Sequence, residues 1–253
     1  MRRDLLVLGG VAIALGVVLG QLGFFDGERL GRGLVNAGRF ASDMVPPDAS
    51  VLAVAGRALL ETVQMAFAGT LLGFLISLPL GILGTRHLFP SFVTSLARLV
   101  SAVVRTVPVL LWAILFVVIV GLGPLAGTLG VALYTVGYLA KLYAELFEGT
   151  DPEILEAVRG VGASRLHLVR FVVLPEGANA VLAQLLFMLE YNIRASSILG
   201  FVGAGGVGFV MQVYLQTLEY QRLATVLLLI LGLVLAMDAL SGWVRRRFLL
   251  APR

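Results

Sequence analysis

The chain has 253 residues, of which 59% are hydrophobic and 13% charged, and its formal net charge is +4. This composition excludes an ordinary soluble domain and indicates an all-α membrane protein with several spans. Cysteine is absent and the two histidines, His87 and His167, lie in separate loops, so neither a disulfide framework nor a metal site is expected. The lysines and arginines are spread over the ends of the apolar segments instead of forming one face. This pattern favours a role in setting membrane topology over nucleic-acid binding.

The first apolar segment, residues 5–25, has 21 residues without a charge, enough to cross a hydrocarbon core of about 30 Å. It is longer than the apolar region of a signal peptide, about 7–15 residues, and lacks a convincing cleavage site. We therefore predict an uncleaved span that begins in the cytoplasm. Residues 26–50 are predicted to be an extracytoplasmic connection, either a tether, which we favour, or an amphipathic helix at the membrane surface.

The second span is predicted over residues 54–85. Small residues let transmembrane helices approach one another closely, and this segment carries Gly69, Gly73, Gly81 and Gly84. Pro79 lies inside it and is expected to kink the helix.

The next apolar stretch, residues 106–140, has no charge, and as one helix its 35 residues would be about 52 Å long, too long for one crossing. The glycine-rich residues 121–127 are the natural turn. We therefore predict a third span over residues 97–120 and a fourth over residues 124–147.

The last two spans are predicted over residues 177–199 and 223–244. The segment between them is glycine-rich over residues 200–208 and is then predicted to be a polar loop up to residue 222. This assignment gives six spans, with thirteen bases in the segments on the side of the termini and five on the other side. The asymmetry predicts that both termini are cytoplasmic.

The longest polar stretch, residues 151–175, follows the fourth span on the cytoplasmic side. Thr150 and Glu153 have the spacing of a capping box, which predicts a short helix from residue 152. A glycine break and a second short helix should follow, with a stop at Leu174 and Pro175. Such a hairpin is either a docking element or an ordinary amphipathic loop.

This stretch resembles the cytoplasmic loop of ABC-importer permeases that seats in a cleft of the ATPase subunit. The family pattern is Glu-Ala-Ala, then Gly, then Ile-x-Leu-Pro at fixed spacing, and Val158 and Val172 are mild departures from it. The matching positions, which the resemblance implies are the ATPase-coupling residues, are Glu156, Ala157, Gly162, Leu174 and Pro175.

Further stretches resemble phosphonate-transport permeases, from about Pro46 to the last span. They include Arg105-Thr106-Val107-Pro108 and the run from Asn192 to Gly200. One departure is Val109, where the family often has an acid. The resemblance implies a type I ABC-importer permease domain over residues 51–253, preceded by an N-terminal helix and connecting segment over residues 1–50.

The partners are also implied by the resemblance. The permease would be a homodimer in the cytoplasmic membrane of a prokaryote, in contact with lipid, driven by two ATPase subunits and supplied by an extracytoplasmic substrate-binding protein. This chain has no GxxxxGK[ST], so ATP and magnesium are expected on the partner ATPase, with no cofactor and no catalytic residue in this chain.

We predict that the substrate path includes Arg105, Glu190, Asn192 and Arg194, because a guanidinium can bind an oxyanion in bidentate fashion. Arg194 is about 25 Å from the cytoplasmic start of its span, which places it near the outer end. The rival interpretations are a structural Glu190–Arg194 pair and a topology signal for Arg105.

A glycine pattern, GxGxxG, is formed by Gly203, Gly205 and Gly208. An apolar span precedes it, where a dinucleotide site needs a strand, so cofactor binding is not expected. We interpret these glycines, with Gly206, as a flexible turn at the outer face and a candidate outer gate.

The function predicted is import of phosphonate, phosphite or a phosphate ester by alternating access. An importer of the same build for another cargo, such as methionine, is the first alternative. An ion-coupled secondary transporter is the second, although no internal repeat of the kind typical of that class is evident.

Overall fold

The computed structural model describes residues 2–249, and side chains are described for residues 7–247. The chain forms two compact units, residues 1–47 and residues 48–253. Within residues 2–249 all regular structure is helical, as the composition predicts.

The first unit consists of α1 (Arg2–Gln21) and α2 (Gly27–Asp43). The α2 helix begins at Asp26, whose side chain accepts a hydrogen bond from the Arg29 amide at 3.0 Å. None of its residues is buried, and Leu30 and Leu34 on one face are exposed. The segment is therefore helical, as the surface-helix alternative requires, and its contact with a membrane stays a prediction.

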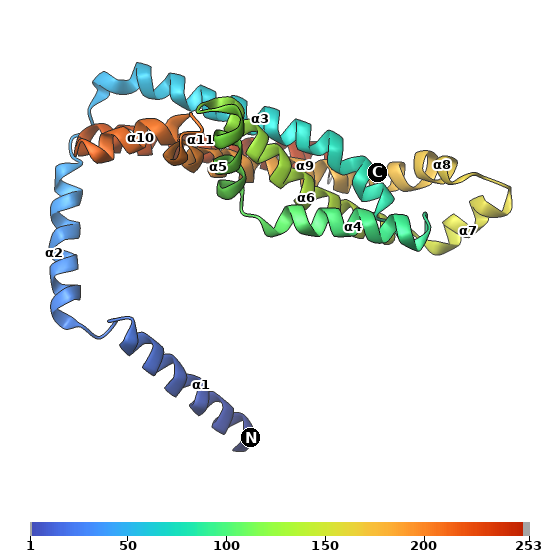
Figure 1. Cartoon of the computed structure of the whole chain (residues 1–253), viewed down its shortest axis with the longest axis horizontal. Helices are drawn as coiled ribbons and strands as arrows, with labels where there is room; N and C mark the ends of the chain where they lie inside the picture. The colour runs from blue at the N-terminus through green and yellow to red at the C-terminus, as the bar shows by residue number, and fades with distance from the viewer. Residues whose placement is uncertain (1, 250–253) are drawn as a thin grey trace. The chain divides into compact units, whose positions relative to one another are not determined.

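The second unit is a bundle of helices (Figure 1). In chain order it contains η1 (Ala49–Val51), α3 (Leu52–Leu83), α4 (Ser91–Thr106), α5 (Val109–Val120), α6 (Pro124–Glu148), α7 (Pro152–Gly160), α8 (Arg165–Leu168), η2 (Val169–Val173), α9 (Leu174–Leu199), η3 (Gly200–Val202), α10 (Val207–Gln216), α11 (Tyr220–Val244) and η4 (Arg245–Leu249).

The centre of this bundle is α6, which lies between α3 and α4 in Figure 1. Thirteen of its 25 residues are buried, against five of the 25 in α11. Its start at Pro124 and the preceding turn agree with the sequence, since Gly121 and Gly123 have φ values of +91° and +128° that glycine tolerates best.

Glycines of α3 form the contact with α6, as the sequence predicts. A methyl group at Gly69 would lie 2.7 Å from the Val131 Cγ1 atom, and one at Gly73 would lie 2.5 Å from the Thr135 Cβ atom. Gly81, further along α3, is packed against α6 in the same way. These distances leave no room for a side chain, so the two backbones approach as closely as small residues allow.

The other side of α6 uses its own glycines. A methyl group at Gly130 would lie 2.8 Å from the Ala113 nitrogen of α5, and one at Gly137 would lie 2.8 Å from the Arg105 nitrogen of α4. Close backbone contact on both sides explains why α6 is the most buried helix of the unit.

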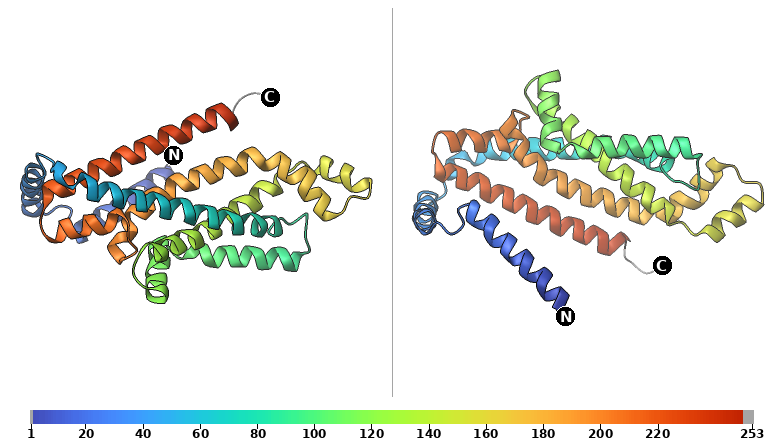
Figure 2. Two further views of the ribbon diagram at one scale, coloured as in Figure 1. Left: turned by 90° about the horizontal axis from the view of Figure 1, so that it is seen from above. Right: turned by 60° about the horizontal axis from the view of Figure 1, so that its bottom comes forward.

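The predicted third span is not one straight helix. It is broken between α4 and α5, whose axes differ in direction by 87° (Figure 2). Pro108 causes the break, because a residue before proline is driven out of the helical region, and Val107 is extended with φ −90° and ψ 120°. The indole nitrogen of Trp112 donates to the Val104 carbonyl at 3.1 Å and closes the turn.

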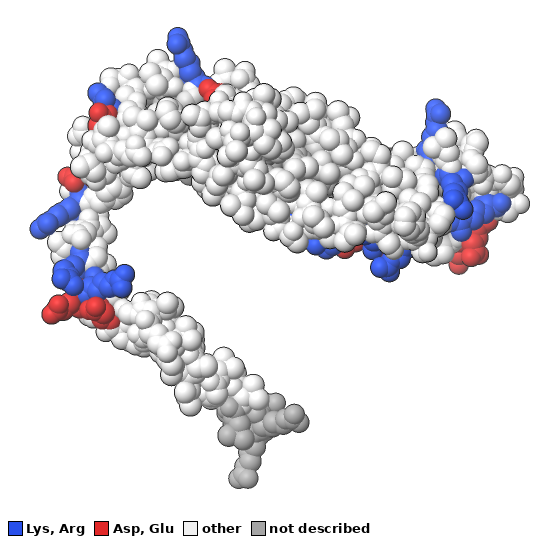
Figure 3. Space-filling view, in the orientation of Figure 1, with Lys and Arg blue, Asp and Glu red and all other residues white. Residues whose placement is uncertain are grey.

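Four helical segments of the described chain are long and apolar enough to cross a membrane, or five if α4 and α5 count as one broken span. They are Ala49–Leu83, Pro124–Glu148, Arg165–Val202 and Tyr220–Arg247. By length and composition, the described chain thus supports four of the six predicted spans, or five if α4 and α5 form one, and the count of six is not confirmed. Figure 3 shows charged side chains gathered around α7 and α8, while much of the middle of unit 2 is uncharged.

The predicted polar loop up to residue 222 is wrong, because most of it is the helix α10. Val207 is buried and packs with Ala55 of α3 and Val226 of α11. The glycines before this stretch and its scattered polar residues, such as Gln212 and Gln216, concealed a short apolar face that only tertiary contacts reveal.

The start of α11 is fastened to the start of α3. The Asp48 amide donates to the Gln221 carbonyl at 3.2 Å, and the Arg222 Nε atom donates to the Asp48 carboxylate at 3.1 Å. Hydrogen bonding by Ser50, and then by Arg222, lowers the pKa of Asp48. The carboxylate is therefore ionised at neutral pH, and the ends of the two helices are held by a charged pair.

Substitution of two glycines of α3 by alanine is expected to have opposite effects. Gly73→Ala should lower the free energy of unfolding by about 1–3 kcal/mol, because the new methyl group overlaps Thr135. Gly56→Ala is the matched control, since nothing lies within 4 Å of that site and alanine has the better helix propensity. Thermal unfolding in detergent measures both; equal midpoints would contradict the packing.

Candidate functional site

The polar hairpin after α6 begins at a cap different from the predicted one. Asp151, and not Thr150, caps α7, and its Oδ1 atom accepts from the Glu153 amide at 2.9 Å. Thr150 is buried at the end of α6, so its side chain is withdrawn from the new helix. The first helix and the following break are otherwise where the sequence places them.

The predicted stop at Leu174 and Pro175 is wrong. The chain passes from α8 through the π-helical turn η2 directly into α9. The Leu174 amide donates to the carbonyl of Val169, five residues earlier. Proline lacks an amide and its ring needs space, and a widened π turn just before it provides that space without ending the helix.

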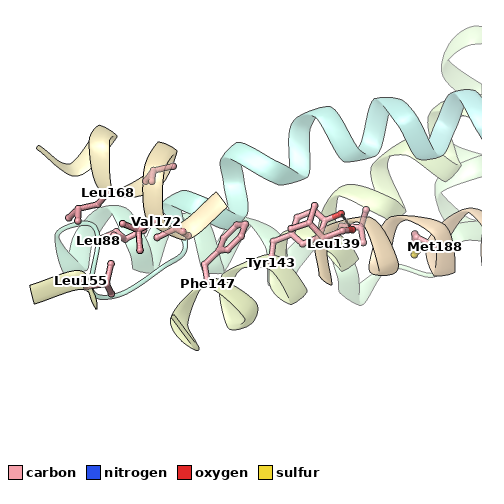
Figure 4. Packing of buried hydrophobic residues seen from close by; sticks show 11 residues of the cluster. Leu88, Leu139, Tyr143, Phe147, Leu155, Leu168, Val172 and Met188 are labelled. Carbon is pink, nitrogen blue, oxygen red and sulfur yellow. Dashed lines mark hydrogen bonds between the residues drawn. The ribbon is translucent and has the colours of Figure 1, made fainter. Parts of the chain in front are cut away.

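A buried apolar cluster fastens the hairpin to the bundle (Figure 4). Leu155 of α7, Leu168 of α8 and Val172 of η2 pack with Leu88 from the connection between α3 and α4. The guanidinium of Arg159 also donates to the His87 carbonyl. These contacts from four segments hold the hairpin in one position relative to the helices.

His87 contributes through its backbone, and its ring is not a charged group at neutral pH. Burial lowers the pKa of His87, and the nearby Arg159 acts in the same direction against Glu148. The positive charge at this end of the bundle therefore comes from arginines.

The outer side of the hairpin is open to solvent. Glu156 and Ala157 are exposed, and the apolar side chains of Val161 and Leu166 are 84% and 74% exposed. Gly162 has φ +84°, a left-handed conformation that strongly favours glycine. A rigid support that carries exposed apolar and acidic residues is suited to contact with another protein.

The last two predicted coupling residues have different surroundings. Leu174 is half-buried and packs against the apolar cluster, whereas Pro175 is exposed. Leu174 therefore supports the hairpin from inside, and its part in ATPase coupling stays a prediction.

Glu190 and Arg194 form the predicted pair on α9, with 2.8 Å between Glu190 Oε1 and Arg194 Nη1. Glu190 is 7% exposed and has a second cation, Arg245, whose Nη2 atom lies 3.9 Å from Oε2. Nothing in the sequence indicates this partner, which follows α11. The predicted pair is thus part of a cluster of three charged side chains, which also includes Arg245.

Two predictions conflict here, namely that Arg194 lies near the outer end of its span and that Arg245 lies on the cytoplasmic side. Both arginines contact Glu190, so they lie at the same level of the bundle. The depth was counted from residue 177, but the helical segment that includes α9 begins at Arg165 and continues beyond that point. The start of the span that hydropathy predicts, residue 177, is therefore not the residue where the helix begins.

Asn192 joins three helices at the centre of the bundle. It is fully buried, and its Nδ2 atom donates to Thr70 Oγ1 of α3 and to Thr135 Oγ1 of α6, at 2.8 Å each. The Thr70 hydroxyl donates onward to the Ala66 carbonyl, so it is oriented to accept from Asn192. This position gives Asn192 a structural role that the sequence pattern did not reveal.

The glycine loop before α10 is packed against other elements. Gly203, Gly205 and Gly206 have φ values of +83°, +78° and +72°. Gly208, in α10, lies so close to α9 that a methyl group there would be 2.5 Å from the Ser197 carbonyl oxygen. A loop enclosed in this way is not a freely flexible turn.

Two residues of α3 cap the start of α10. The Gly206 amide donates to Glu61 Oε1 at 2.9 Å, and the Val207 amide donates to Thr62 Oγ1 at 2.8 Å. A carboxylate at this position also stabilises the positive end of the helix dipole. The role of the outer gate stays a prediction, and any movement of this loop would have to break both bonds.

Arg105 lies in the last turn of α4, exposed and on another element than the other predicted path residues. The structure therefore brings together Glu190 and Arg194, and it places Asn192 in the packed centre. Arg105 lines a separate cavity between α3, α4 and α6.

Comparisons with known proteins identify relatives over most of the chain. The family profile described as "Binding-protein-dependent transport system inner membrane component" matches residues 51–250. The phosphite transport system permease protein PtxC of Stutzerimonas stutzeri is 37% identical over 245 residues, which is 95% of this chain and 89% of that protein.

A second relative is the phosphate-import permease protein PhnE of Mycolicibacterium smegmatis, 39% identical over 206 residues. That match covers 81% of this chain and 39% of the relative. Among solved structures, an inward-facing crystal form of the MetNI methionine ABC transporter has a TM-score of 0.67 and 26% identity, covering 79% of this chain and 98% of that one.

Truncation of Asn192 is expected to loosen the contact of α3, α6 and α9. Asn192→Ala should lower the free energy of unfolding by about 1–3 kcal/mol, because two buried threonine hydroxyls lose their donor. Asn179→Ala, at an exposed position of the same helix, is the control and should change it by less than about 0.5 kcal/mol. Thermal unfolding compares the two variants, and equal effects would argue against the buried junction.

Proposed function

Since the chain belongs to the family of binding-protein-dependent transport system inner membrane components, we propose that it is the permease subunit of an ATP-driven importer for phosphonate, phosphite or a phosphate ester. The cargo is supported by the 37% identity to a phosphite permease over nearly the whole chain. Other relatives in this set are a phosphate-import permease and further phosphite transport permeases.

A role in coupling to the ATPase is supported by one observation, that the hairpin is held firmly to the bundle. Its buried side is fixed by Leu155 and Leu168, while Glu156, Ala157 and Val161 are presented outward. An ATPase that seats against this surface would transmit its closure through η2 into α9, because these elements follow one another without a break. The proposed ATP and magnesium sites are on that separate ATPase chain.

The proposed assembly is a pair of these permeases with two ATPases and a substrate-binding protein. Alternation between inward-open and outward-open arrangements would move the anion across the membrane. In this scheme both termini are cytoplasmic. The glycine loop at Gly203–Gly208 would change its contact with α3 when the binding protein docks. Glu61 and Thr62 are the groups that would release it.

Uptake into liposomes tests class and cargo together. Liposomes that hold this chain and its ATPase are given ATP inside and the binding protein outside, and phosphonate, phosphite and methionine are compared. We expect uptake of the phosphorus oxyanions that requires both ATP and the binding protein. ATP-dependent uptake of methionine would remove the cargo assignment, and uptake driven by an ion gradient without ATP would remove the class.

Coupling is tested by two neighbouring glycines of the hairpin. Gly162→Ala should lower ATP-driven uptake and ATPase co-purification several-fold, because alanine is strained at φ +84° by about 1–2 kcal/mol. Gly160→Ala is the matched control, since that residue is helical and has nothing within 4 Å. Glu156→Lys should weaken docking as well, without a change in thermal stability. Unchanged docking in Gly162→Ala and Glu156→Lys would refute the role of the hairpin.

A further inference from the structure

A cavity of about 190 Å³ opens between α3, α4 and α6. It exists because small residues face one another where the three helices meet. The small lining residues are Gly84, Ser101, Ala102, Ala140 and Ala144. The volume is below the range of about 300–1,000 Å³ that drug-sized ligands occupy, so the cavity suits a small ligand or one end of a larger one.

The lining carries three cations and one acid. Arg98 is already engaged, because its Nε atom donates to the Gly84 carbonyl at 2.7 Å and its Nη2 atom lies 2.5 Å from Glu148 Oε1. The Lys141 ammonium lies 3.2 Å from Glu145 Oε1. Two of the three positive charges are therefore balanced by carboxylates of α6.

Arg105 is the third cation, and in the part of the chain that the structure describes it has no ion-pair partner. Its backbone nitrogen is seated against Gly137 of α6, which fixes where the side chain starts. Ser101 does not compete as a donor, since its hydroxyl proton is given to the Ala97 carbonyl at 2.8 Å. The cavity thus has an excess positive charge, and Arg105 carries it.

We propose that this cavity binds a phosphoryl or phosphonyl oxyanion, with Arg105 as its principal ligand and Lys141 as a second cation. This inference rests on the proposed function and adds a site for the anion at the end of α4. A guanidinium matches two oxygens of such a group, and it is ionised at all physiological pH values. The apolar part of the lining suits the carbon substituent of a phosphonate.

The same chemistry could come from two sources. One is the free oxyanion that the permease transports, and the other is the headgroup of an anionic phospholipid whose chains lie along the helices. Both place an oxyanion against Arg105, so the experiment is designed with one arm for each source.

The test uses the permease assembled with its ATPase in lipid nanodiscs, without ATP and without binding protein. In the first arm the lipid is neutral phosphatidylcholine, and equilibrium binding of radiolabelled phosphite and methylphosphonate is measured. In the second arm the nanodiscs contain phosphatidylglycerol, and the amount retained after exchange into neutral lipid is measured by mass spectrometry.

Three variants test whether the anion binds in this cavity. Arg105→Gln removes the unbalanced charge, and Ala102→Phe fills the cavity from an exposed position of α4 while all charges remain. Arg57→Gln is the control, because it removes one exposed arginine from α3 far from the cavity lining. Thermal unfolding of all three shows whether the fold is kept.

We expect Arg105→Gln and Ala102→Phe each to weaken binding about tenfold or more in one arm, with Arg57→Gln unchanged. An effect in the first arm identifies the free anion, and an effect in the second identifies the lipid headgroup. Binding that is the same in all folded variants in both arms would overturn the proposal. ATP-driven uptake is measured separately, so unchanged binding in all variants together with normal ATP-driven uptake would overturn this inference and leave the proposed function intact.

Discussion

The close approach of α3 and α6 is the contact on which the rest of the bundle depends. Lipid chains are as apolar as leucine, so burial alone gives helices little reason to associate in a membrane. Association then relies on tight packing, which Gly69 and Gly73 allow by leaving the backbone of α3 against Val131 and Thr135. Once α6 is seated there, its own glycines receive α4 and α5 on the opposite side, so one helix positions three neighbours.

The second constraint is the continuity of α9. Its beginning is joined through η2 to the hairpin, its middle holds Asn192 in the three-helix junction, and its end leads into the glycine loop. A displacement of the hairpin therefore acts on the centre of the bundle without passing through a flexible segment. Only rigid packing can carry such a displacement, and the π turn at residues 169–173 is the one place in this path where the helical geometry is relaxed.

Several sequence patterns that report on local chemistry gave correct results, although the capping box at Thr150 did not. The glycine spacing on α3, the turn before Pro124 and the hairpin with its left-handed Gly162 all follow from what single residues permit. Features that depend on contacts between distant segments were missed. Thr70 and Thr135 are ordinary residues until Asn192 lies between them, and nothing near Glu190 in the sequence indicates Arg245.

Two predictions made from prolines were wrong for the same reason, because they too depend on the surrounding structure. Pro108 and Pro175 were both evident in the sequence, yet Pro108 breaks a predicted span and Pro175 does not stop a helix. The difference lies in the preceding residues, since Val107 is extended while residues 169–173 form a π turn that makes room for the ring. A proline marks a place where the helix must adjust, and the surrounding packing decides whether it bends or continues.

The charged groups of the bundle point to where an anion can be held. Glu190 has two arginines, Lys141 and Arg98 each have a carboxylate, and Glu61 accepts from the start of α10. A protein that must pass an anion cannot leave many cations unbalanced inside it, because each would bind the cargo too tightly to release it. Arg105 lies at a small cavity beside cations that are already paired, and its charge there is a moderate attraction for an anion.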